Sequence, residues 1–408
     1  MLCRFCKNPL HHEFVDLVNA PASNSFLTKE QLNEPETYYP LKVYVCDHCF
    51  LVQVDEYKKS DAIFDSNYVY FSSYSTTWLS HAERYVEMIA PRLGLTKKSL
   101  AVEIASNDGY LLQYLVKKGI PVLGIEPTQN TAEAAREKGV ETITEFFGTD
   151  LAHQLVAKGI KADLLLGNNV LAHVPDIVDF VGGMKILLKP EGVITMEFPH
   201  LLQLVENSQF DTIYHEHFSY LSLYTVSKIF EDRGLVLYDV EEIPTHGGSL
   251  RIFARHRENQ ALPISDHIRR VAKKEEEKGI ATIEYYKNFQ KKTLEIKLGV
   301  LTFLIKAKRE GKSVAAYGAA AKGNTLLNYC GVKADLVDFV VDANPNKRDK
   351  FLPGSHIPVV NEEYLKKQKP EYVIILPWNI KDEIVKQLDY IKAWKGQFVV
   401  FIPEFQII

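Results

Sequence analysis

Short apolar runs alternate with amphipathic segments through the middle of the chain, from about residue 77 to residue 256. The apolar runs predict short strands at 100–105, 121–126, 140–143, 162–167 and 192–197. The amphipathic segments predict helices at 77–89, 110–118, 128–138, 149–158 and 176–188. Strands and helices that alternate in this way are typical of a parallel sheet with helices on both faces. We therefore expect a Rossmann-like α/β domain in this part of the sequence.

The end of this domain departs from the alternating pattern. A helix is predicted at 223–232, with Ser222 as its cap and Gly234 at its end. Two last strands, at 235–241 and 248–254, are close enough in sequence to form an antiparallel hairpin. A hairpin that places one antiparallel strand in an otherwise parallel sheet resembles the fold of S-adenosylmethionine-dependent methyltransferases.

The last third of the chain has a different organisation. Residues 266–308 are rich in charge and predict a helical connector, in which 275–278 form a solvated face. A buried strand at 313–317 then leads into a turn of small residues that opens a helix. Further strand-to-helix units are predicted at 337–341 and 372–376. This order of elements predicts a second Rossmann-like, nucleotide-binding fold.

Length and composition define the class of protein. A chain of 408 residues is too long for one ordinary core, and 46% hydrophobic with 25% charged residues is normal for a soluble globular protein. No apolar run reaches the roughly 18 residues of a membrane helix and the N-terminus is not a signal peptide, so we expect a cytoplasmic protein without a membrane partner. The net charge of -4 gives no reason to expect nucleic-acid binding. The predicted domains are 1–70, 71–258 and 259–408.

Four cysteines form two CxxC pairs near the start of the chain, Cys3 with Cys6 and Cys46 with Cys49. Each pair can bring two thiolates to one side of a tight turn, and four thiolates suit a tetrahedral zinc ion. Two redox-active pairs are the alternative, but strand-like runs such as 43–45 flank the cysteines and a thioredoxin-like context is missing. We therefore predict a structural zinc module, because four sulfur ligands close the metal site.

The first strand of the α/β domain passes through Glu103 into a turn that reaches Gly109, at the edge where a Rossmann sheet binds its ligands. The glycine-rich pattern usual at this turn is reduced to Gly109, with Ser106 and Asn107 in the crowded places. The second strand ends at Glu126, which can accept hydrogen bonds from both hydroxyls of a ribose. An acidic residue at this distance also suits NAD, so these residues leave S-adenosylmethionine and NAD open.

Residues 211–221 concentrate groups that can move protons near neutral pH. The groups belong to Tyr214, His215, Glu216, His217 and Tyr220. A polar loop anchored by its aromatic rings is the alternative, but groups crowded in this way perturb one another's pKa values. The segment follows the fifth strand closely, so the topology brings it to the edge that also carries Asn168 and His173. We therefore predict an acid–base site at residues 211–221.

A turn of small residues, 318–325, opens the helix after the strand at 313–317 and contains Lys322. Backbone donors and the helix dipole attract an anion to such a turn, and the lysine adds a positive charge. A small domain that only packs against the rest is the alternative, but it leaves Lys322 without a role. We predict that a phosphate group binds at this turn.

Together these motifs resemble the nucleotide-sugar C-methyltransferases, the C-3 methyltransferases of deoxysugar pathways, over essentially the whole chain. The motifs are the two CxxC pairs, residues 68–73, the turn 106–109, residues 211–221, residues 247–251 and the turn 318–325. The resemblance implies S-adenosylmethionine-dependent methylation at C-3 of a dTDP-linked 4-keto deoxysugar. The substrate would lie between the middle and C-terminal domains. We expect the enzyme to be a monomer.

The resemblance also implies roles for individual residues. The catalytic candidates are Tyr214, Glu216, His217, His173 and one of Tyr68 or Tyr70. The cofactor candidates are Glu103, Ser106, Asn107, Gly109, Glu126, Phe147 and Asn168, and the substrate candidates are Arg251, Lys322, Asn324 and Asn379. We expect His217 to remove the proton beside the ketone, because a neutral imidazole works near pH 7. Glu216 would orient the substrate, and Tyr214 with His173 would donate to the enolate oxygen.

Two other classes of protein share part of this pattern. A zinc-containing NAD-dependent sugar oxidoreductase would share both α/β folds, and a non-enzymatic zinc scaffold would share only the zinc module. Titration of the purified protein with labelled S-adenosylmethionine and with NAD would separate the three classes.

Overall fold

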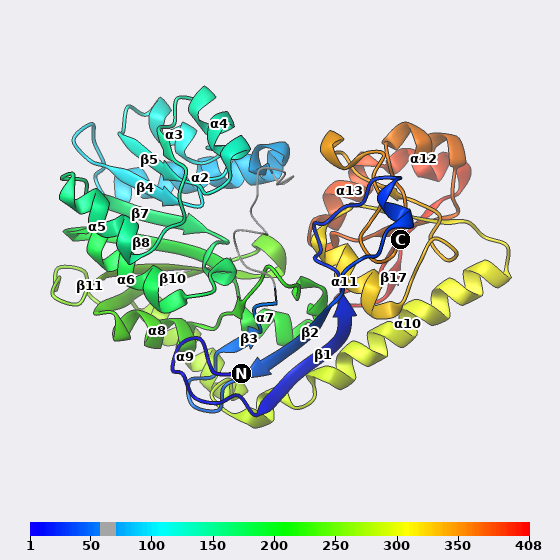
Figure 1. Ribbon diagram of the computed structural model, residues 1–408, viewed down its shortest axis with the longest axis horizontal. Helices are drawn as coiled ribbons and strands as arrows, with labels where there is room; N and C mark the ends of the chain where they lie inside the picture. Colours follow the sequence, from blue (N-terminus) through cyan, green and yellow to red (C-terminus); the bar gives the residue numbers. More distant parts are fainter. Residues whose placement is uncertain (58–70) are drawn as a thin grey trace.

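Three β-sheets organise the protein in the computed structural model, which describes residues 1–57 and 71–408 (Figure 1). A seven-stranded sheet lies on the left of Figure 1 in cyan and green, and a six-stranded sheet lies on the right in orange and red. A four-stranded sheet, mostly blue, lies at the bottom between them. The predicted site residues Tyr68 and Tyr70 fall outside the described residues.

The seven-stranded sheet has the strand order β10-β11-β8-β7-β4-β5-β6. Its strands are β4 (Ala101–Ile104), β5 (Val122–Ile125), β6 (Thr142–Ile143), β7 (Ala162–Asn168), β8 (Leu188–Pro199), β10 (Leu235–Ile243) and β11 (Ser249–His256). The strands from β8 to β6 pair in parallel, whereas β11 runs antiparallel to both β8 and β10. This reversed strand is the methyltransferase feature that the final hairpin predicted.

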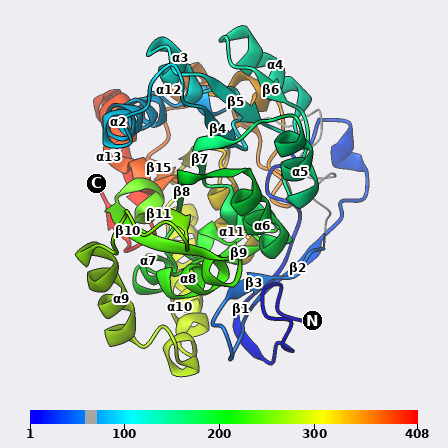
Figure 2. The same ribbon diagram turned by 90° about the vertical axis from the view of Figure 1, so that its left-hand side faces the viewer.

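Helices cover both faces of this sheet (Figure 2). They are α2 (Thr76–Arg92), α3 (Leu112–Lys117), α4 (Gln129–Glu137), α5 (Thr149–Ala157), α6 (Ile177–Leu187) and α8 (Leu223–Asp232). Apolar side chains of α5, α6 and α8 share one core with the sheet, and those of α2, α3 and α4 share another. Ser222 caps α8 by accepting from the N–H of Thr225, as the sequence predicts. The boundaries lie within a few residues of the predicted ones.

The four-stranded sheet joins the zinc module to the segment predicted to hold the acid–base site. Its order is β1-β2-β3-β9, with every neighbouring pair antiparallel. The strands are β1 (His12–Ala20), β2 (Tyr39–Val45), β3 (Val52–Val54) and β9 (Ser219–Tyr220). Because β9 belongs to residues 211–221, the N-terminal sheet fixes one end of that segment.

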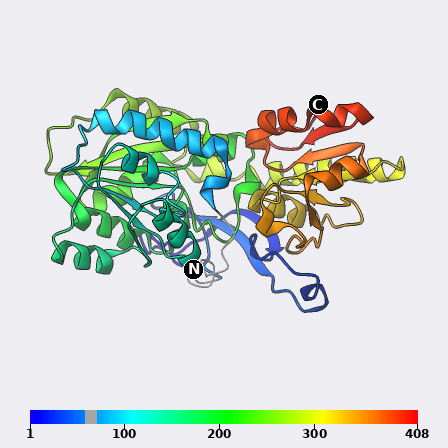
Figure 3. The same ribbon diagram turned by 90° about the horizontal axis from the view of Figure 1, so that it is seen from above.

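The loop between β1 and β2, residues 21–38, leaves the N-terminal sheet and reaches the C-terminal lobe, as Figure 3 shows. Leu27 forms a β-bridge with Phe351. The carboxylate of Glu36 accepts a hydrogen bond from the N–H of Gly354, and its other oxygen lies 2.9 Å from Nε2 of His356. The zinc module therefore contacts both of the larger lobes.

The six-stranded sheet forms a second Rossmann-like layer with the order β14-β13-β12-β15-β16-β17. Its strands are β12 (Val314–Tyr317), β13 (Val340–Val341), β14 (Val359–Val360), β15 (Tyr372–Ile375), β16 (Gln397–Val400) and β17 (Gln406–Ile407). The pairs are parallel except for β16 with β17. Helix α11 (Ala321–Cys330) begins directly after β12, and α12 (Glu362–Gln368) and α13 (Lys381–Gln387) follow later. The predicted anion-binding turn is therefore a strand-to-helix turn.

The charged connector is helical, as predicted, and consists mainly of two helices. Helix α9 (Asp266–Lys278) ends at Gly279, whose φ of 81° stops the helix, and α10 (Phe289–Arg309) begins ten residues later. Glu275 is not solvated, contrary to the prediction, because only 1% of it is exposed. Its two oxygens accept from the N–H groups of Leu223 and Tyr224 at the start of α8, and His200 lies 2.7 Å away. Within the described parts of the chain, no helix is long and apolar enough to cross a membrane.

Glu275→Gln should lower the free energy of unfolding by about 2–3 kcal/mol, because the amide places a donor against backbone donors that need an acceptor. Urea denaturation measures the change. Glu276→Gln is the matched control, since Glu276 is the exposed neighbour on the same helix and should leave the free energy nearly unchanged. Equal stability of the two variants would contradict a buried capping role for Glu275.

Candidate active site

A cavity of about 1140 Å³ lies between the seven-stranded sheet and the C-terminal lobe. Predicted site residues that line it are Asn107, Glu126, Phe147, Asn168, His173, Tyr214, Glu216, His217, Arg251, Lys322 and Asn379. The predicted residues Glu103, Ser106, Gly109 and Asn324 are not lining residues. The volume slightly exceeds the roughly 300–1000 Å³ of a typical small-ligand pocket, so the cavity has room for two ligands side by side.

The turn after β4 has the backbone of a glycine-rich loop with few of its glycines. Ala105 and Asn107 have φ values of 56° and 48°, a left-handed conformation that is uncommon for residues other than glycine. Gly109 is also left-handed, and a Cβ added to it would lie 3.2 Å from Ala135 of α4. Gly109 therefore lets the turn pack against a helix, while Asn107 stands on the cavity wall.

Glu103 and Ser106 lie beneath the cavity rather than on its surface. Both are fully buried, and burial raises the pKa of Glu103 well above its ordinary value. Ser106 fills the space beside β5, since a Cβ added to Gly124 would lie 2.5 Å from its Oγ. The structure thus gives these two residues a place in the support of the turn, where the sequence analysis expected cofactor contacts.

Glu126 lines the cavity at the carboxyl end of β5, but protein groups already hold its carboxylate. Oε2 accepts from the N–H of Asn107 at 2.9 Å, and Oε1 accepts from the N–H of Thr128 at 3.0 Å and from the Thr128 hydroxyl. A carboxylate has about four acceptor positions, so one position remains for a ligand. A contact with both ribose hydroxyls would require Thr128 to release its hydroxyl hydrogen bond.

Aromatic rings enclose the cofactor side of the cavity. Trp78 of α2 stacks on His81 with ring centroids 4.9 Å apart and on Tyr110 at 6.0 Å. The Tyr110 hydroxyl accepts from the amide of Asn168 at 3.2 Å. Phe147 meets Phe180 edge to face on another wall. These rings give the cavity flat apolar surfaces near the turn after β4.

Tyr214 and His217 form a hydrogen-bonded pair, with 2.7 Å between the tyrosine oxygen and Nε2. The other ring nitrogen of His217 lies 2.9 Å from the carbonyl oxygen of Thr212. A carbonyl oxygen only accepts, so Nδ1 carries the proton and Nε2 accepts from the Tyr214 hydroxyl. The structure thus fixes the tautomer of His217 and directs its free electron pair at Tyr214.

Three histidines on the cavity wall are held in the neutral form. Burial lowers the pKa of His173 and of His246 to about 4, and it lowers the pKa of His217 well below its ordinary value. The rings of His173 and His217 meet edge to face at 4.6 Å, so a positive charge on either one disfavours a charge on the other. Near pH 7 each ring is therefore a neutral imidazole, which has one nitrogen that can accept a proton and one N–H that can donate.

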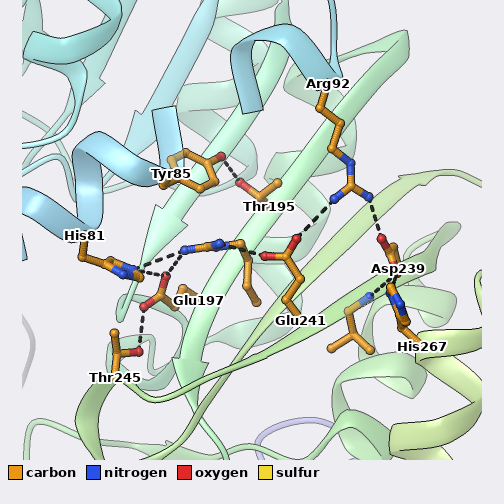
Figure 4. A network of polar contacts seen from close by, with 11 residues as sticks. His81, Tyr85, Arg92, Thr195, Glu197, Asp239, Glu241, Thr245 and His267 are labelled. Atoms are coloured by element: carbon orange, nitrogen blue, oxygen red, sulfur yellow. Dashed lines mark hydrogen bonds and ion pairs between the residues drawn. The ribbon is translucent and has the colours of Figure 1, made fainter. Parts of the chain in front are cut away.

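Arg251, predicted to contact the substrate, lines the cavity and also pairs with Glu197 and Glu241, two residues labelled in Figure 4. Its guanidinium donates to Glu197 at 3.1 Å and to Glu241 at 2.8 Å. Glu197 is fully buried, lies 2.9 Å from His81 and also accepts from Thr245. Because these carboxylates satisfy the Arg251 charge, its role is to hold the cavity wall rather than to neutralise a free anion.

Lys322 stands at the start of α11 and faces the cavity from the C-terminal lobe. Its ammonium group donates to Oδ1 of Asn379 at 2.9 Å and lies 4.8 Å from the Trp378 ring centroid. Burial lowers the pKa of Lys322 to about 8, although the carboxylate of Asp211 opposes this change. Ala320, the N-cap, provides no side-chain hydrogen bond to α11. The turn therefore presents a cation and free helix donors to the cavity, as the sequence predicts.

Asp211 and Trp378 connect this turn to the proton-transfer pair. The indole Nε1 of Trp378 donates to the Asp211 carboxylate at 2.6 Å. Both residues are buried, and burial raises the pKa of Asp211 to about 6. Asp211 directly precedes Thr212, whose carbonyl holds His217.

Asn324, predicted to bind substrate, points away from the cavity. It is only 1% exposed, and its amide donates to the carbonyl of Ser23 in the β1–β2 loop at 2.6 Å. The neighbouring Thr325 donates from its hydroxyl to the carbonyl of Ile213 at 2.8 Å. Helix α11 therefore holds two segments of the site wall from behind, which corrects the prediction for Asn324.

Several lining residues were missed in the sequence. His246 has a left-handed backbone, with φ of 54°, and its side chain lies 2.9 Å from that of Asn169, the neighbour of Asn168 at the predicted edge. Lys347 donates to the carbonyl of Ala319 in the anion-binding turn. Asn24 reaches the cavity from the N-terminal lobe. The position of His246 next to two glycines was a usable signal, whereas the others required the tertiary structure.

The four predicted zinc ligands meet at one point outside the cavity. The sulfurs of Cys3, Cys6, Cys46 and Cys49 all lie within 4.8 Å of one another, with Cys3 to Cys49 and Cys6 to Cys46 both at 3.5 Å. Tetrahedral zinc with bonds of about 2.3 Å separates its sulfurs by about 3.8 Å, which these positions fit. Hydrogen bonds from Cys49 and Gln53 lower the pKa of Cys3 to about 4. The chemistry of the donor set therefore suits zinc, and none of the four cysteines lines the cavity.

Known families match all three parts of the chain. A family of zinc-binding domains matches residues 3–64, a methyltransferase domain matches residues 78–240, and a C-methyltransferase C-terminal domain matches residues 244–403. The C-methyltransferase NovU of Streptomyces niveus is 34% identical over 100% of this chain and 96% of its own length. None of these matches supports the alternative of an oxidoreductase.

Other similar proteins share only part of the chain. The ubiquinone biosynthesis O-methyltransferase of Bartonella bacilliformis is 28% identical over 26% of this chain and 42% of its own length. Among solved structures, magnesium protoporphyrin IX methyltransferase from Synechocystis PCC 6803 covers 43% of this chain and 81% of its own, with 18% identity and a TM-score of 0.35. The CcbJ methyltransferase of Streptomyces caelestis covers 43% and 89%, with 13% identity and a TM-score of 0.34.

Cys46→Ser should abolish zinc binding and unfold the N-terminal lobe, because structural zinc contributes on the order of 10 kcal/mol to the folding of a small module. Activity should fall with it, since β9 loses its partner strand. Elemental analysis should find one zinc per wild-type chain and none in the variant. Cys330→Ala, which removes a cysteine remote from the cluster, should keep one zinc. Less than one zinc in carefully handled wild-type protein would contradict the prediction.

Proposed function

The chain belongs to the S-adenosylmethionine-dependent C-methyltransferases, and we propose that its substrate is a nucleotide-linked 4-keto deoxysugar that it methylates at C-3. The observation that carries this proposal is the pairing of Tyr214 with His217 in the same cavity as Lys322. Carbon methylation beside a ketone needs a base, and a sugar nucleotide needs a group that accepts its diphosphate. The resemblance noted in the sequence favours dTDP as the nucleotide.

The two ligands would occupy different sides of the cavity. Asn107, Glu126, Phe147 and Asn168 line the side above β4, β5 and β7, where Rossmann sheets bind their cofactors. S-adenosylmethionine supplies an electrophilic methyl group when it is bound there. The sugar nucleotide would lie on the other side, with its diphosphate at Lys322 and Asn379. Residues 71–258 and 259–408 would then work as cofactor and nucleotide-sugar domains.

Proton removal is the step that this chain must provide. The electron pair on Nε2 of His217 points at the Tyr214 hydroxyl, so we place Tyr214 between His217 and the sugar. The tyrosine oxygen takes the proton from C-3 as its own proton passes to Nε2, and the electrons of the C–H bond form the enolate. The Thr212 carbonyl holds the Nδ1–H of the resulting imidazolium. His217 remains the final acceptor, as the sequence analysis expected, and Tyr214 becomes part of the base.

The other polar groups would orient the sugar and stabilise the enolate oxygen. His173 lies against His217 and is neutral, so a ring N–H can donate where negative charge develops. Glu216 lines the cavity with a carboxylate that can accept from sugar hydroxyl groups. Neither role requires these residues to change their protonation state.

Tyr214→Phe should reduce methylation and C-3 exchange by about 10²- to 10⁴-fold, the usual contribution of a positioned proton-transfer group. Exchange is followed by NMR with the 4-keto sugar nucleotide and S-adenosylhomocysteine in D₂O. His217→Asn should show the same loss with both ligands still bound. If Tyr214→Phe exchanges at the wild-type rate, His217 acts on the sugar directly.

The matched control is Tyr220→Phe. Tyr220 lies in the same segment, with its ring 6.3 Å from that of His217, but it does not line the cavity. Among the described residues no side chain bonds its buried hydroxyl, which faces the Tyr214 backbone, so removing the oxygen should leave exchange nearly unchanged. Failure of wild-type protein to methylate or exchange any 4-keto sugar nucleotide would overturn the proposed substrate.

Lys322→Ala should weaken sugar-nucleotide binding about 10- to 100-fold, because it removes a charge-assisted hydrogen bond, and should leave S-adenosylmethionine affinity unchanged. The pKa of Lys322 is lowered to about 8, so the wild-type group is charged below that pH and neutral above it. Wild-type kcat/KM for the sugar nucleotide should therefore fall as the pH rises through about 8. Lys322→Ala should lack this decline, and the exposed Lys333→Ala should retain it. Unchanged affinity of Lys322→Ala in calorimetry would refute the placement.

A further inference from the structure

A residue of the zinc-binding lobe holds a candidate catalytic residue from the central domain. The amide nitrogen of Asn24 lies 2.9 Å and 2.8 Å from the two carboxylate oxygens of Glu216. A carboxylate only accepts, so the nitrogen of Asn24 faces it and donates to both oxygens. Both side chains line the cavity. The contact joins two loop residues that are 192 positions apart in the sequence.

Helix α11 holds both the loop that carries Asn24 and the segment that carries Glu216. The carbonyl of Ser23, the preceding residue, accepts from the buried amide of Asn324 at 2.6 Å. The next helical residue, Thr325, holds the carbonyl of Ile213, three residues before Glu216. The first turn of α11 therefore sets the distance between the Asn24 loop and the segment that carries Glu216.

The rest of the loop is anchored to the C-terminal lobe. Leu27 pairs with Phe351, and Glu36 holds both Gly354 and His356, as described above. Residues 21–38 thus cross from the zinc module to the C-terminal lobe (Figure 3), and Asn24 meets Glu216 near the start of that crossing. A loop whose role was only to join β1 and β2 would not need these contacts with the C-terminal lobe.

We propose that Asn24 is a positioning residue of the active site, which orients Glu216 toward the sugar and makes the zinc-binding lobe a working part of the site. The proposal rests on the proposed function, because it assigns Glu216 to the sugar nucleotide. The two hydrogen bonds hold the carboxylate of Glu216 in one orientation, in which it lines the cavity. The zinc ion then acts on catalysis indirectly, by keeping the base of this loop folded.

The test compares Asn24→Ala, Glu216→Gln and the double variant by steady-state kinetics with the 4-keto sugar nucleotide. Asn24→Ala should lower kcat/KM about 10- to 100-fold, the usual effect of a hydrogen bond to a charged group. In the Glu216→Gln background the same change should have little further effect, because the two residues act as one unit. Effects that multiply, or wild-type kcat/KM in Asn24→Ala, would overturn the proposal.

A second substitution separates the hydrogen bond from the space it fills. Asn24→Asp has nearly the same shape but places a carboxylate against Glu216, so it should lose at least as much activity as Asn24→Ala. Asn33→Ala, an exposed asparagine of the same loop, should behave as wild type. All variants should keep one zinc per chain and wild-type affinity for S-adenosylmethionine. Wild-type activity in Asn24→Asp would also overturn the proposal.

The design distinguishes this proposal from the proposed function. If wild-type protein methylates no 4-keto sugar nucleotide, the substrate assignment fails before any variant is compared. If wild type is active and the double-variant test shows independent effects, only the role of Asn24 fails.

Discussion

The hydrogen bond from the indole of Trp378 to the carboxylate of Asp211 connects the two large lobes at the point where the chemistry is expected. Asp211 is followed at once by Thr212, the residue whose carbonyl fixes the tautomer of His217. Lys322 lies over the same indole ring, so the turn 318–325 and the Tyr214–His217 pair share one support. A displacement of the C-terminal lobe would therefore move Tyr214 and His217 as well as Lys322. The shared contact with Trp378 gives a physical reason why the cavity lies between the two lobes.

Burial governs the electrostatics of the cavity. It holds three histidines neutral, lowers the pKa of Lys322 and raises that of Asp211. All of these shifts favour the uncharged form, because an enclosed site solvates ions poorly. Two residues at the cavity wall remain charged, because Glu197 and Arg251 form an ion pair.

The N-terminal module acts through its geometry. Its zinc ligands do not line the cavity, yet its sheet takes up β9 and its loop brings Asn24 to Glu216. Residues 211–221 are therefore held by the N-terminal sheet and by the C-terminal lobe: by β3 at one end, by α11 at Ile213 and by Trp378 at Asp211. A segment that carries so many titratable groups gains a fixed shape from these contacts, and proton transfer depends on such fixed distances.

The sequence by itself determined the local features: the strand and helix positions, the reversed strand, the cysteine cluster and the strand-to-helix turn that carries Lys322. These depend on hydrophobic period, capping and ligand spacing, which are properties of neighbouring residues. Only the tertiary structure decided which polar groups face the cavity. It turned Asn324 and Glu275 inward, closed Arg251 into an ion network and brought Asn24 from the zinc lobe to Glu216. A side chain's partners across lobes depend on contacts between residues far apart in sequence, and local periodicity contains no information about them.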